Sequence, residues 1–155
     1  MKQATLCLLF RQDEILLAMK KRGFGAGKWN GPGGKVEPGE APEVTAIREL
    51  EEEVGLKARP EDLTKVASSI FRFKGRPEWD QEVHIYALRS WTGTPGETEE
   101  MRPQWFKLED IPYAQMWADD IHWLPPVLEG KRIRGEFHFD YEGNNIESYK
   151  IEELN

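Results

Sequence analysis

The chain has 155 residues, of which 39% are hydrophobic and 11% are aromatic. This length provides for one substantial hydrophobic core, so we expect a single domain over residues 1–155. The net charge of −7 argues against a nucleic acid polymer as partner, because affinity for a polyanion depends on clustered lysine and arginine.

The apolar and metal-binding residues narrow the class further. The longest apolar runs, such as 6–10 and 15–19, are far shorter than the roughly 20 residues that cross a bilayer. No secretion signal leads the chain, so we expect a soluble cytoplasmic protein with no membrane partner. A single cysteine, Cys7, and three scattered histidines argue against a disulfide framework and a zinc site. Any metal should therefore be a hard cation bound by oxygen.

The first predicted elements are a β-hairpin and a loop. Apolar residues at 5–10 and 14–19 flank a polar turn at 11–13, a pattern typical of two antiparallel strands. The segment that follows, 20–39, is rich in glycine and predicts a loop.

An amphipathic helix is predicted next, over residues 42–54. Apolar residues recur in this segment at helical spacing, and Gly55 supplies a stop signal. The apolar positions are Val44, Ile47, Leu50 and Val54.

The second half of the chain predicts a mixed sheet. Strands are expected at 66–73, 83–91, 104–108 and 133–139, and a last hairpin that turns at 142–145 carries Tyr149 and Ile151. A second helix is expected to begin at Asp119 or Asp120, either of which can cap it, while Pro125 and Pro126 leave its end open. Strands outnumber helices in a mixed order, so the expected fold class is α/β (α+β), with helices packed on a mixed sheet.

Three carboxylates share one face of the 42–54 helix. Glu49, Glu52 and Glu53 stand at i, i+3 and i+4, opposite the apolar positions. Like charges at this spacing destabilise a helix by roughly 0.2–0.5 kcal/mol per pair, which a divalent cation would offset. The cation expected is Mg²⁺, with Mn²⁺ as the alternative. For the helix alone, a solvated acidic face is the competing interpretation.

The sequence around this helix carries a longer motif. From Gly34 the chain reads GKVEPGEAPEVTAIRELEEEVGL. This run resembles the Nudix box: a glycine, five residues, a glutamate, seven residues, then Arg-Glu-aliphatic-X-Glu-Glu-X-Gly-aliphatic. The fixed positions are filled by Gly34, Glu40, Arg48, Glu49, Leu50, Glu52, Glu53, Gly55 and Leu56. The resemblance implies the Nudix fold, an α/β/α sandwich with a mixed sheet flanked by helices, and magnesium-dependent hydrolysis of a diphosphate linkage.

The resemblance also implies roles for individual residues. The metal ligands would be Glu49, Glu52, Glu53 and the backbone carbonyl of Gly33, with Glu100 from a distant loop as a further metal ligand or catalytic residue. Glu53 is expected as a ligand and Glu52 as ligand or base, and the identity of the general base stays open.

Two further motif residues have expected supporting roles. Arg48 is expected to orient a glutamate through a bidentate pair rather than to touch phosphate. Glu40 lies ahead of the helix, where it would favour the positive N-terminus or assist the metal site.

Segments outside the motif indicate the substrate. MKKRGFGAGKWNGPGGKV from Met19, EMRPQWF from Glu100 and MWADD at 116–120 resemble the mammalian MutT-type members of the Nudix family. That resemblance implies hydrolysis of oxidised purine nucleoside triphosphates, such as 8-oxo-dGTP and 2-oxo-dATP, to the monophosphate and pyrophosphate. The implied substrate contacts are Thr5, Lys20, Phe24, Asn30, Gly34, Lys35, Phe71, Trp117, Asp119 and Asp120.

The residue types of this set suit a base pocket. Trp117 can stack on a purine, the Asn30 amide can both donate and accept, and an aspartate can accept from base N–H groups. Core packing is the competing interpretation for Trp117, and helix capping for the two aspartates. If Asp119 and Asp120 both enter an apolar pocket, the pair should keep a proton, and moving it would match the pocket to oxidised guanine or to oxidised adenine.

The sequence departs from the mammalian pattern at Pro32, which replaces an aromatic residue, and at 76–81, a different and slightly longer turn. Two other functions remain open at this point. One is a Nudix enzyme for an alkylated purine nucleotide, a dinucleoside polyphosphate or a nucleotide sugar, and the other is a non-catalytic nucleotide sensor. In each case the partner is a small nucleotide, and we expect a monomer.

Overall fold

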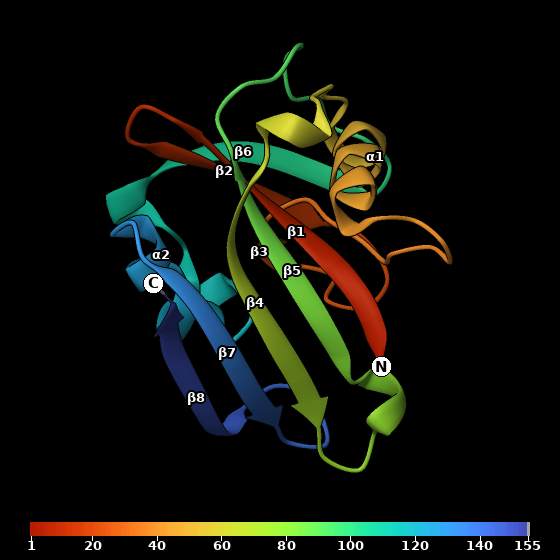
Figure 1. Cartoon of the computed structure of the whole chain (residues 1–155), viewed down its shortest axis with the longest axis vertical. Coiled ribbons are helices and arrows are strands. Elements are labelled where there is room, and N and C mark those ends of the chain that lie inside the picture. The colour runs from red at the N-terminus through yellow and green to blue at the C-terminus, as the bar shows by residue number, and fades with distance from the viewer. Residues whose placement is uncertain (155) are drawn as a thin grey trace.

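A mixed sheet forms the centre of the fold (Figure 1). The structure is a computed structural model that describes residues 1–154. Within this range the strands are β1 (Lys2–Arg11), β2 (Glu14–Lys20), β3 (Trp29–Asn30), β4 (Thr64–Phe73), β5 (Gln81–Leu88), β6 (Met101–Lys107), β7 (Arg132–Phe139) and β8 (Ile146–Leu154). They pair in the order β3-β2-β1-β5-β4-β7-β8, and β6 pairs with β2. The β1–β5 and β4–β7 pairs are parallel and the others antiparallel.

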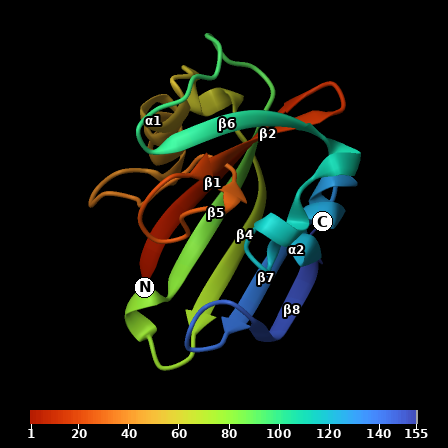
Figure 2. The same ribbon diagram turned by 180° about the vertical axis from the view of Figure 1, so that it is seen from behind.

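Two α-helices lie on opposite faces of this sheet: α1 (Pro42–Val54) and α2 (Asp120–Leu128). Side chains alternate between the faces along β1, so Cys7 packs in one cluster with Leu50 of α1, whereas Leu8 packs in the other with Trp123 of α2. Figure 1 shows α1 in front of the sheet, and Figure 2, seen from behind, shows α2 in front. The three-layer α/β/α arrangement expected from the sequence is therefore confirmed.

The bounds predicted for α1 are confirmed at both ends. Pro42 occupies the first turn, where its missing N–H costs no helical hydrogen bond. Gly55 adopts a left-handed conformation with φ 76° and donates its N–H to the Glu51 carbonyl, which ends the helix. The side of α1 that carries Leu50 and Val54 is fully buried against the sheet.

The other predicted elements differ from the structure mainly at their ends. Helix α2 begins at Asp120 and continues through both Pro125 and Pro126 to Leu128. Strand β5 ends at Leu88, three residues before the predicted end. The short strand β3 was not predicted, and four 3-10 turns lie at Pro60–Asp62, Pro77–Trp79, Leu108–Asp110 and Tyr113–Gln115.

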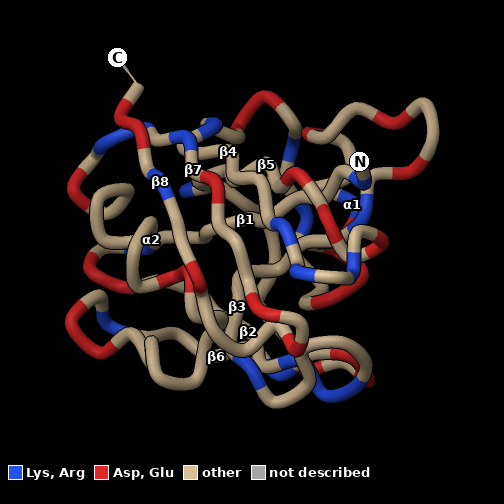
Figure 3. The backbone as a smooth tube through the Cα atoms, turned by 90° about the horizontal axis from the view of Figure 1, so that it is seen from below, with Lys and Arg blue, Asp and Glu red and all other residues tan. Residues whose placement is uncertain are grey.

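The surface carries charges of both signs. Figure 3 shows lysine and arginine interspersed with aspartate and glutamate around the whole outline. In the described part of the chain, no helix is long and apolar enough to cross a membrane.

Candidate active site

One cavity of about 390 Å³ opens between the sheet and the loops that follow β2 and precede α2. Its lining includes all ten side chains or backbone positions that the sequence analysis assigned to substrate: Thr5, Lys20, Phe24, Asn30, Gly34, Lys35, Phe71, Trp117, Asp119 and Asp120. Gly33 and Glu53 also line it. Segments 115 residues apart in the chain thus meet at one site that contains a motif glutamate.

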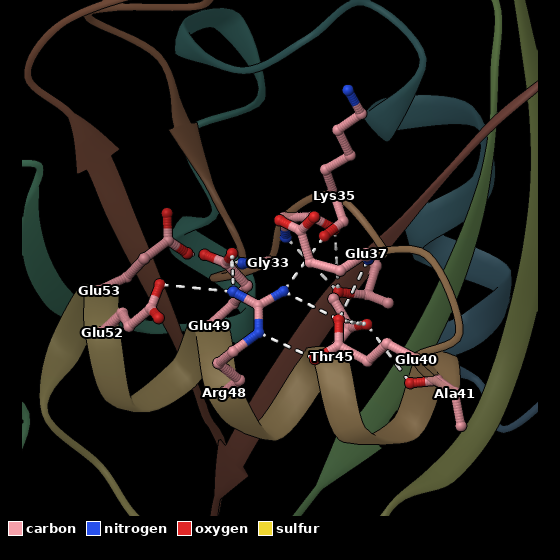
Figure 4. A network of polar contacts seen from close by, with 12 residues as sticks. Gly33, Lys35, Glu37, Glu40, Ala41, Thr45, Arg48, Glu49, Glu52 and Glu53 are labelled. Atoms are coloured by element: carbon pink, nitrogen blue, oxygen red, sulfur yellow. Dashed lines mark hydrogen bonds and ion pairs between the residues drawn. The ribbon is translucent and has the colours of Figure 1, made fainter.

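The carboxylates of α1 differ in their exposure. Glu53 is only 5% exposed and its Oε1 accepts a 2.7 Å hydrogen bond from the Gly33 N–H. The Glu49 side chain is 17% exposed and that of Glu52 is 57% exposed. Figure 4 shows the three on the same side of α1. The acidic face of α1 is therefore not uniformly exposed to solvent, because Glu53 is buried and lines the cavity.

Burial changes the acidity of the two inner carboxylates. It raises the pKa of Glu53 from 4.5 to about 8, although the Gly33 N–H acts in the opposite direction. The negative charges of Glu49 and Glu100 raise it further. Burial also raises the pKa of Glu49, with a smaller contribution from Glu100. The loop before β6 thus brings Glu100 close enough to act electrostatically on both glutamates.

Arg48 connects α1 to the loop before it. Its Nε donates a 2.9 Å hydrogen bond to Glu40 Oε2, and its Nη2 donates one of the same length to Glu40 Oε1 (Figure 4). Its Nη1 donates at 2.9 Å to Glu49 Oε1. The Arg48 guanidinium, helped by the Thr45 hydroxyl, lowers the pKa of Glu40 to about 2. The bidentate pair is therefore made with Glu40, while Glu49 receives a single bond. Arg48 does not line the cavity, so its geometry is that of a positioning residue.

The carboxylates near the Gly33 loop are of the kind that binds a divalent cation. Nearby carboxylates that repel one another, as Glu49, Glu53 and Glu100 do, are the hard oxygen ligands that Mg²⁺ and Mn²⁺ prefer. Among residues 1–154, no three His, Cys, Asp or Glu side chains are already arranged around one point as a metal cluster. The residues thus fit such an ion in chemistry, and substrate phosphates and water would complete the coordination, as is usual for Mg²⁺.

Glycine is required where the loop after β3 crosses β1. Thr5 N–H donates to the Gly34 carbonyl at 2.8 Å, which holds the loop against the strand. A Cβ on Gly33 would overlap the Thr5 carbonyl group, whose carbon would lie 2.7 Å away. A Cβ on Gly34 would lie 2.6 Å from Glu49 Oε1. This close approach is what places the Gly33 N–H on Glu53.

We expect Gly33→Ala to lower the free energy of unfolding by about 1–3 kcal/mol, because the added methyl group forces the loop away from β1. Gly96→Ala is the matched control, since Gly96 is exposed and a Cβ there would meet nothing within 4 Å. Urea unfolding of both variants measures the difference. Equal losses in the two variants would contradict the packing argument.

Lysines line the cavity, although the protein as a whole has a net charge of −7. Lys20 and Lys35 line it as expected, and the Lys20 charge lowers the pKa of Glu53 slightly. Lys28 also lines it, with its ammonium 5.2 Å from the centre of the Trp117 ring. Lys21 instead donates to the Thr98 carbonyl at 2.7 Å. Lys20, Lys28 and Lys35 thus bring positive charge to the cavity, with Lys20 near Glu53 and Lys28 near Trp117.

Asp119 and Asp120 are 4% and 3% exposed, and both face the cavity. Asp119 occupies the N-cap position of α2 but makes no side-chain cap, and its Oδ2 instead accepts a 2.7 Å hydrogen bond from Trp123 Nε1. Asp120 Oδ2 is buried with no hydrogen-bond partner in the described residues. Burial raises the pKa of both, and the Asp119 charge raises that of Asp120 further. The pair therefore holds its last proton more tightly than an exposed carboxyl does.

Several lining residues were not predicted. Most are apolar side chains from the sheet and α2: Leu6, Ala18, Phe73, Val83, Ile85, Met101, Trp123 and Phe139. Two of them follow from local geometry, since Phe73 is two residues beyond Phe71 on the same strand face and Trp123 is one helical turn beyond Asp119. Phe139 has no such signal, because it comes from β7, which reaches the site only through its pairing with β4.

A helix whose buried carboxylate closes one end of a lysine-lined cavity is the arrangement of a hydrolase directed at phosphate. The comparisons agree: the NUDIX domain model matches residues 1–127, and the chain belongs to the Nudix family and is a hydrolase. Enzymes of this family act on small nucleotides and generally require a divalent metal ion.

The relatives cover almost the whole chain. It is 49% identical over 150 residues to the oxidized purine nucleoside triphosphate hydrolase of Mus musculus, covering 97% of this chain and 94% of the mouse protein. It is 47% identical to the protein of the same name in Danio rerio, covering 99% and 96%. Among solved structures, the MutT protein of Bacillus halodurans superposes with a TM-score of 0.81 at 26% identity, covering 98% of each chain.

Proposed function

We propose that this chain hydrolyses oxidised purine nucleoside triphosphates, with 8-oxo-dGTP and 2-oxo-dATP as the type substrates, to the nucleoside monophosphate and pyrophosphate. One observation carries the proposal: a single cavity is lined both by the buried pair Asp119 and Asp120 and by Glu53 of the carboxylate helix. The names of the mouse and zebrafish relatives, at 47–49% identity, support the same substrate class. The expected purpose is removal of damaged precursors from the nucleotide pool.

The phosphate end of the reaction would be handled by charged groups. Lys20 and Lys35 would bind the triphosphate, and Glu49, Glu52, Glu53 and Glu100, with the Gly33 carbonyl, would hold the metal. When bound, Mg²⁺ neutralises charge on the phosphate oxygens and lowers the pKa of a water molecule. A glutamate left outside the coordination would take the proton of the attacking water.

The base end would be read by hydrogen bonds in an apolar surrounding. Trp117 and Phe71 provide flat surfaces for the purine, and the Asn30 amide both donates and accepts. A proton retained by the two aspartates would give the pocket one donor beside several acceptors. Because this proton can sit on either residue, the same pocket matches the edges of two oxidised purines.

We further propose that the protein works as a cytoplasmic monomer, with Mg²⁺ rather than Mn²⁺, on free nucleotides rather than on nucleic acid polymers. The mixed charges of the surface and the net charge of −7 support the last point. We also propose a single domain over residues 1–155, since β7 pairs with β4 and contributes Phe139 to the cavity.

The proposal predicts pyrophosphate release from a selective set of substrates. Release with magnesium should be measured on oxidised, alkylated and normal purine nucleoside triphosphates, a dinucleoside polyphosphate and a nucleotide sugar. We expect kcat/KM to be at least about 100-fold higher for an oxidised purine than for its normal counterpart, because a buried polar group left unpaired costs about 1–3 kcal/mol and two or more contacts differ. Preference for another substrate would replace the proposal with that activity, and binding without turnover would indicate a sensor.

A further inference from the structure

Five side chains form a continuous row of ring and cation contacts, and the last two of them, Phe24 and Trp117, line the cavity. The Tyr141 ring lies 3.9 Å from the Arg76 guanidinium, which lies 4.2 Å from the Trp79 ring. Trp79 is 4.8 Å from Phe24, and Phe24 is 5.1 Å from Trp117, measured between ring centres. The row connects four loops that are far apart in the sequence, and it ends at a wall of the cavity.

Phe24 lies on a glycine-rich loop, but its ring is held between two tryptophans. It lies in the loop between β2 and β3, where Gly23 and Gly25 have φ values of 83° and 85°. Such a loop has few side chains of its own to fix it, and the Phe24 side chain is 50% exposed. The contacts with Trp117 and Trp79 are what place its ring at the cavity.

Trp79 does not line the cavity, but it is firmly braced. It ends the 3-10 turn Pro77–Trp79 and makes an edge contact with Phe73, a lining residue, at 5.5 Å. The Arg76 guanidinium lies over the Trp79 ring, and Arg76 Nε is buried without a hydrogen-bond partner in the described residues. The cation–π contacts of the Arg76 guanidinium with the Trp79 and Tyr141 rings therefore contribute to holding Arg76 in place.

We propose that Trp79 is a specificity-determining positioning residue that holds Phe24 over the base end of the cavity, with Arg76 and Tyr141 as its support. The inference rests on the proposed function for the identity of the base. A purine that enters must be enclosed beneath the Phe24 ring, so its binding depends on the Trp79 contact. The phosphate end is held by other contacts: the Lys20 backbone pairs with Gly27 and Lys28 at the base of the loop, and no ring or cation contact among the described residues joins Lys20, Lys35 or α1 to the row.

Kinetics test the effect on substrate. We expect Trp79→Ala to raise KM for the preferred oxidised purine nucleoside triphosphate by about 3- to 10-fold, the size of one lost aromatic pair, with kcat changed less than about twofold. Inhibition by inorganic pyrophosphate, which occupies only the phosphate end, should be unchanged. Trp79→Phe should restore most of the affinity. Arg76→Gln should shift KM in the same direction by a smaller factor, since it leaves the Trp79–Phe73 contact in place.

The matched control is Trp91→Ala. Trp91 is also half-buried and stacks on another tryptophan, Trp105, at 5.8 Å, but it has no contact with Phe24 or the cavity. Its KM should equal that of the wild type even if its thermal stability falls as much as that of Trp79→Ala. A KM increase of the same size in both variants would reduce Trp79 to a structural residue and overturn the proposal.

Limited proteolysis tests the same contact without any substrate. Trypsin can cleave after Arg22, whose side chain is 65% exposed in the loop that carries Phe24. We expect cleavage there to be at least about threefold faster in Trp79→Ala than in the wild type or in Trp91→Ala, as followed by mass spectrometry. If Trp79→Ala is cleaved faster but the wild type does not hydrolyse oxidised purines, the proposed function is refuted while the role of Trp79 in holding Phe24 is supported. If the wild type hydrolyses oxidised purines but Trp79→Ala changes neither the cleavage rate nor KM, the role of Trp79 is refuted while the proposed function is supported.

Discussion

Replacing Glu53 with glutamine is expected to lower kcat by about 10²- to 10⁴-fold, the range found when a group that assists proton transfer or holds a catalytic metal is removed. The amide keeps the size of the side chain and can still accept the Gly33 N–H at Oε1. It cannot carry the negative charge that the proposed mechanism requires for holding the metal or for accepting a proton from water. The loss should therefore appear in kcat, measured as pyrophosphate release with saturating magnesium.

The same substitution is expected to stabilise the metal-free protein at high pH. Burial raises the pKa of Glu53 to about 8, above its unfolded value of 4.5, so the folded state holds a proton that the unfolded state releases. The free energy of unfolding of the wild type should consequently fall as pH rises from 4.5 towards 8. Glutamine has no proton to lose, so in EDTA the Tm of Glu53→Gln should exceed that of the wild type at pH 8 and match it near pH 4.5.

Glu51→Gln serves as the control for both readouts. Glu51 lies on the same helix and is exposed, and it occupies an unspecified position between the motif glutamates. Its kcat should stay within about twofold of the wild type, and its Tm should follow the wild type at every pH. A Glu53→Gln protein that keeps most of its activity would remove Glu53 from the catalytic group.

Substituting the buried aspartates is expected to change which oxidised purine is preferred. Asp120→Asn fixes a donor and an acceptor where we propose that the wild type shares a proton with Asp119, so the pocket should lose one of its two donor patterns. A mismatch that leaves a buried polar group unpaired costs about 1–3 kcal/mol, so the ratio of kcat/KM for 8-oxo-dGTP and 2-oxo-dATP should change by about 5- to 150-fold. Asp119→Asn should change this ratio as well.

The pH dependence of that ratio gives a second measurement. Burial and the mutual repulsion of Asp119 and Asp120 raise the pKa of the pair, so it donates below its apparent pKa and loses its donor as pH rises through that value. The ratio should therefore vary with pH in the wild type and be flat in Asp120→Asn. The ratio cancels the titration of Glu53, which is common to both substrates. Asp110→Asn, at an exposed aspartate outside the cavity, should behave as the wild type, and an unchanged ratio in both cavity variants would refute the shared-proton mechanism.

The elements that could be predicted from the sequence are those fixed by local signals. Helix α1 has a proline at its first turn, a glycine at its end and apolar side chains at helical spacing, and its bounds were predicted without error. Strand β5 was predicted to reach Trp91, but it ends at Leu88, before the polar residues Arg89 and Ser90, and the Trp91 ring stacks on Trp105 instead. Strand β3 is only two residues long and lies among glycines, so no periodicity marks it.

The pairing of distant strands and the contacts between distant loops could not be predicted from the sequence. The parallel pairing of β1 with β5 joins Thr5 to His84, and nothing local to either strand specifies that partner. The substrate residues were predicted through a family resemblance, and the cavity gathers all of them. The contribution of Trp79 was missed because it acts through Phe24, a contact between two loops that neither loop encodes alone.

The cavity walls come from both ends of the chain: Leu6 belongs to the first strand, and Phe139 closes the wall from the last but one. During synthesis on the ribosome, the carboxylate helix is complete long before β7 has emerged. A nascent chain therefore has its metal-facing glutamates but no finished room for a purine. A complete base pocket can therefore form only after the final hairpin has joined the sheet. A nucleotide bound there would contact residues from both the first strand and β7.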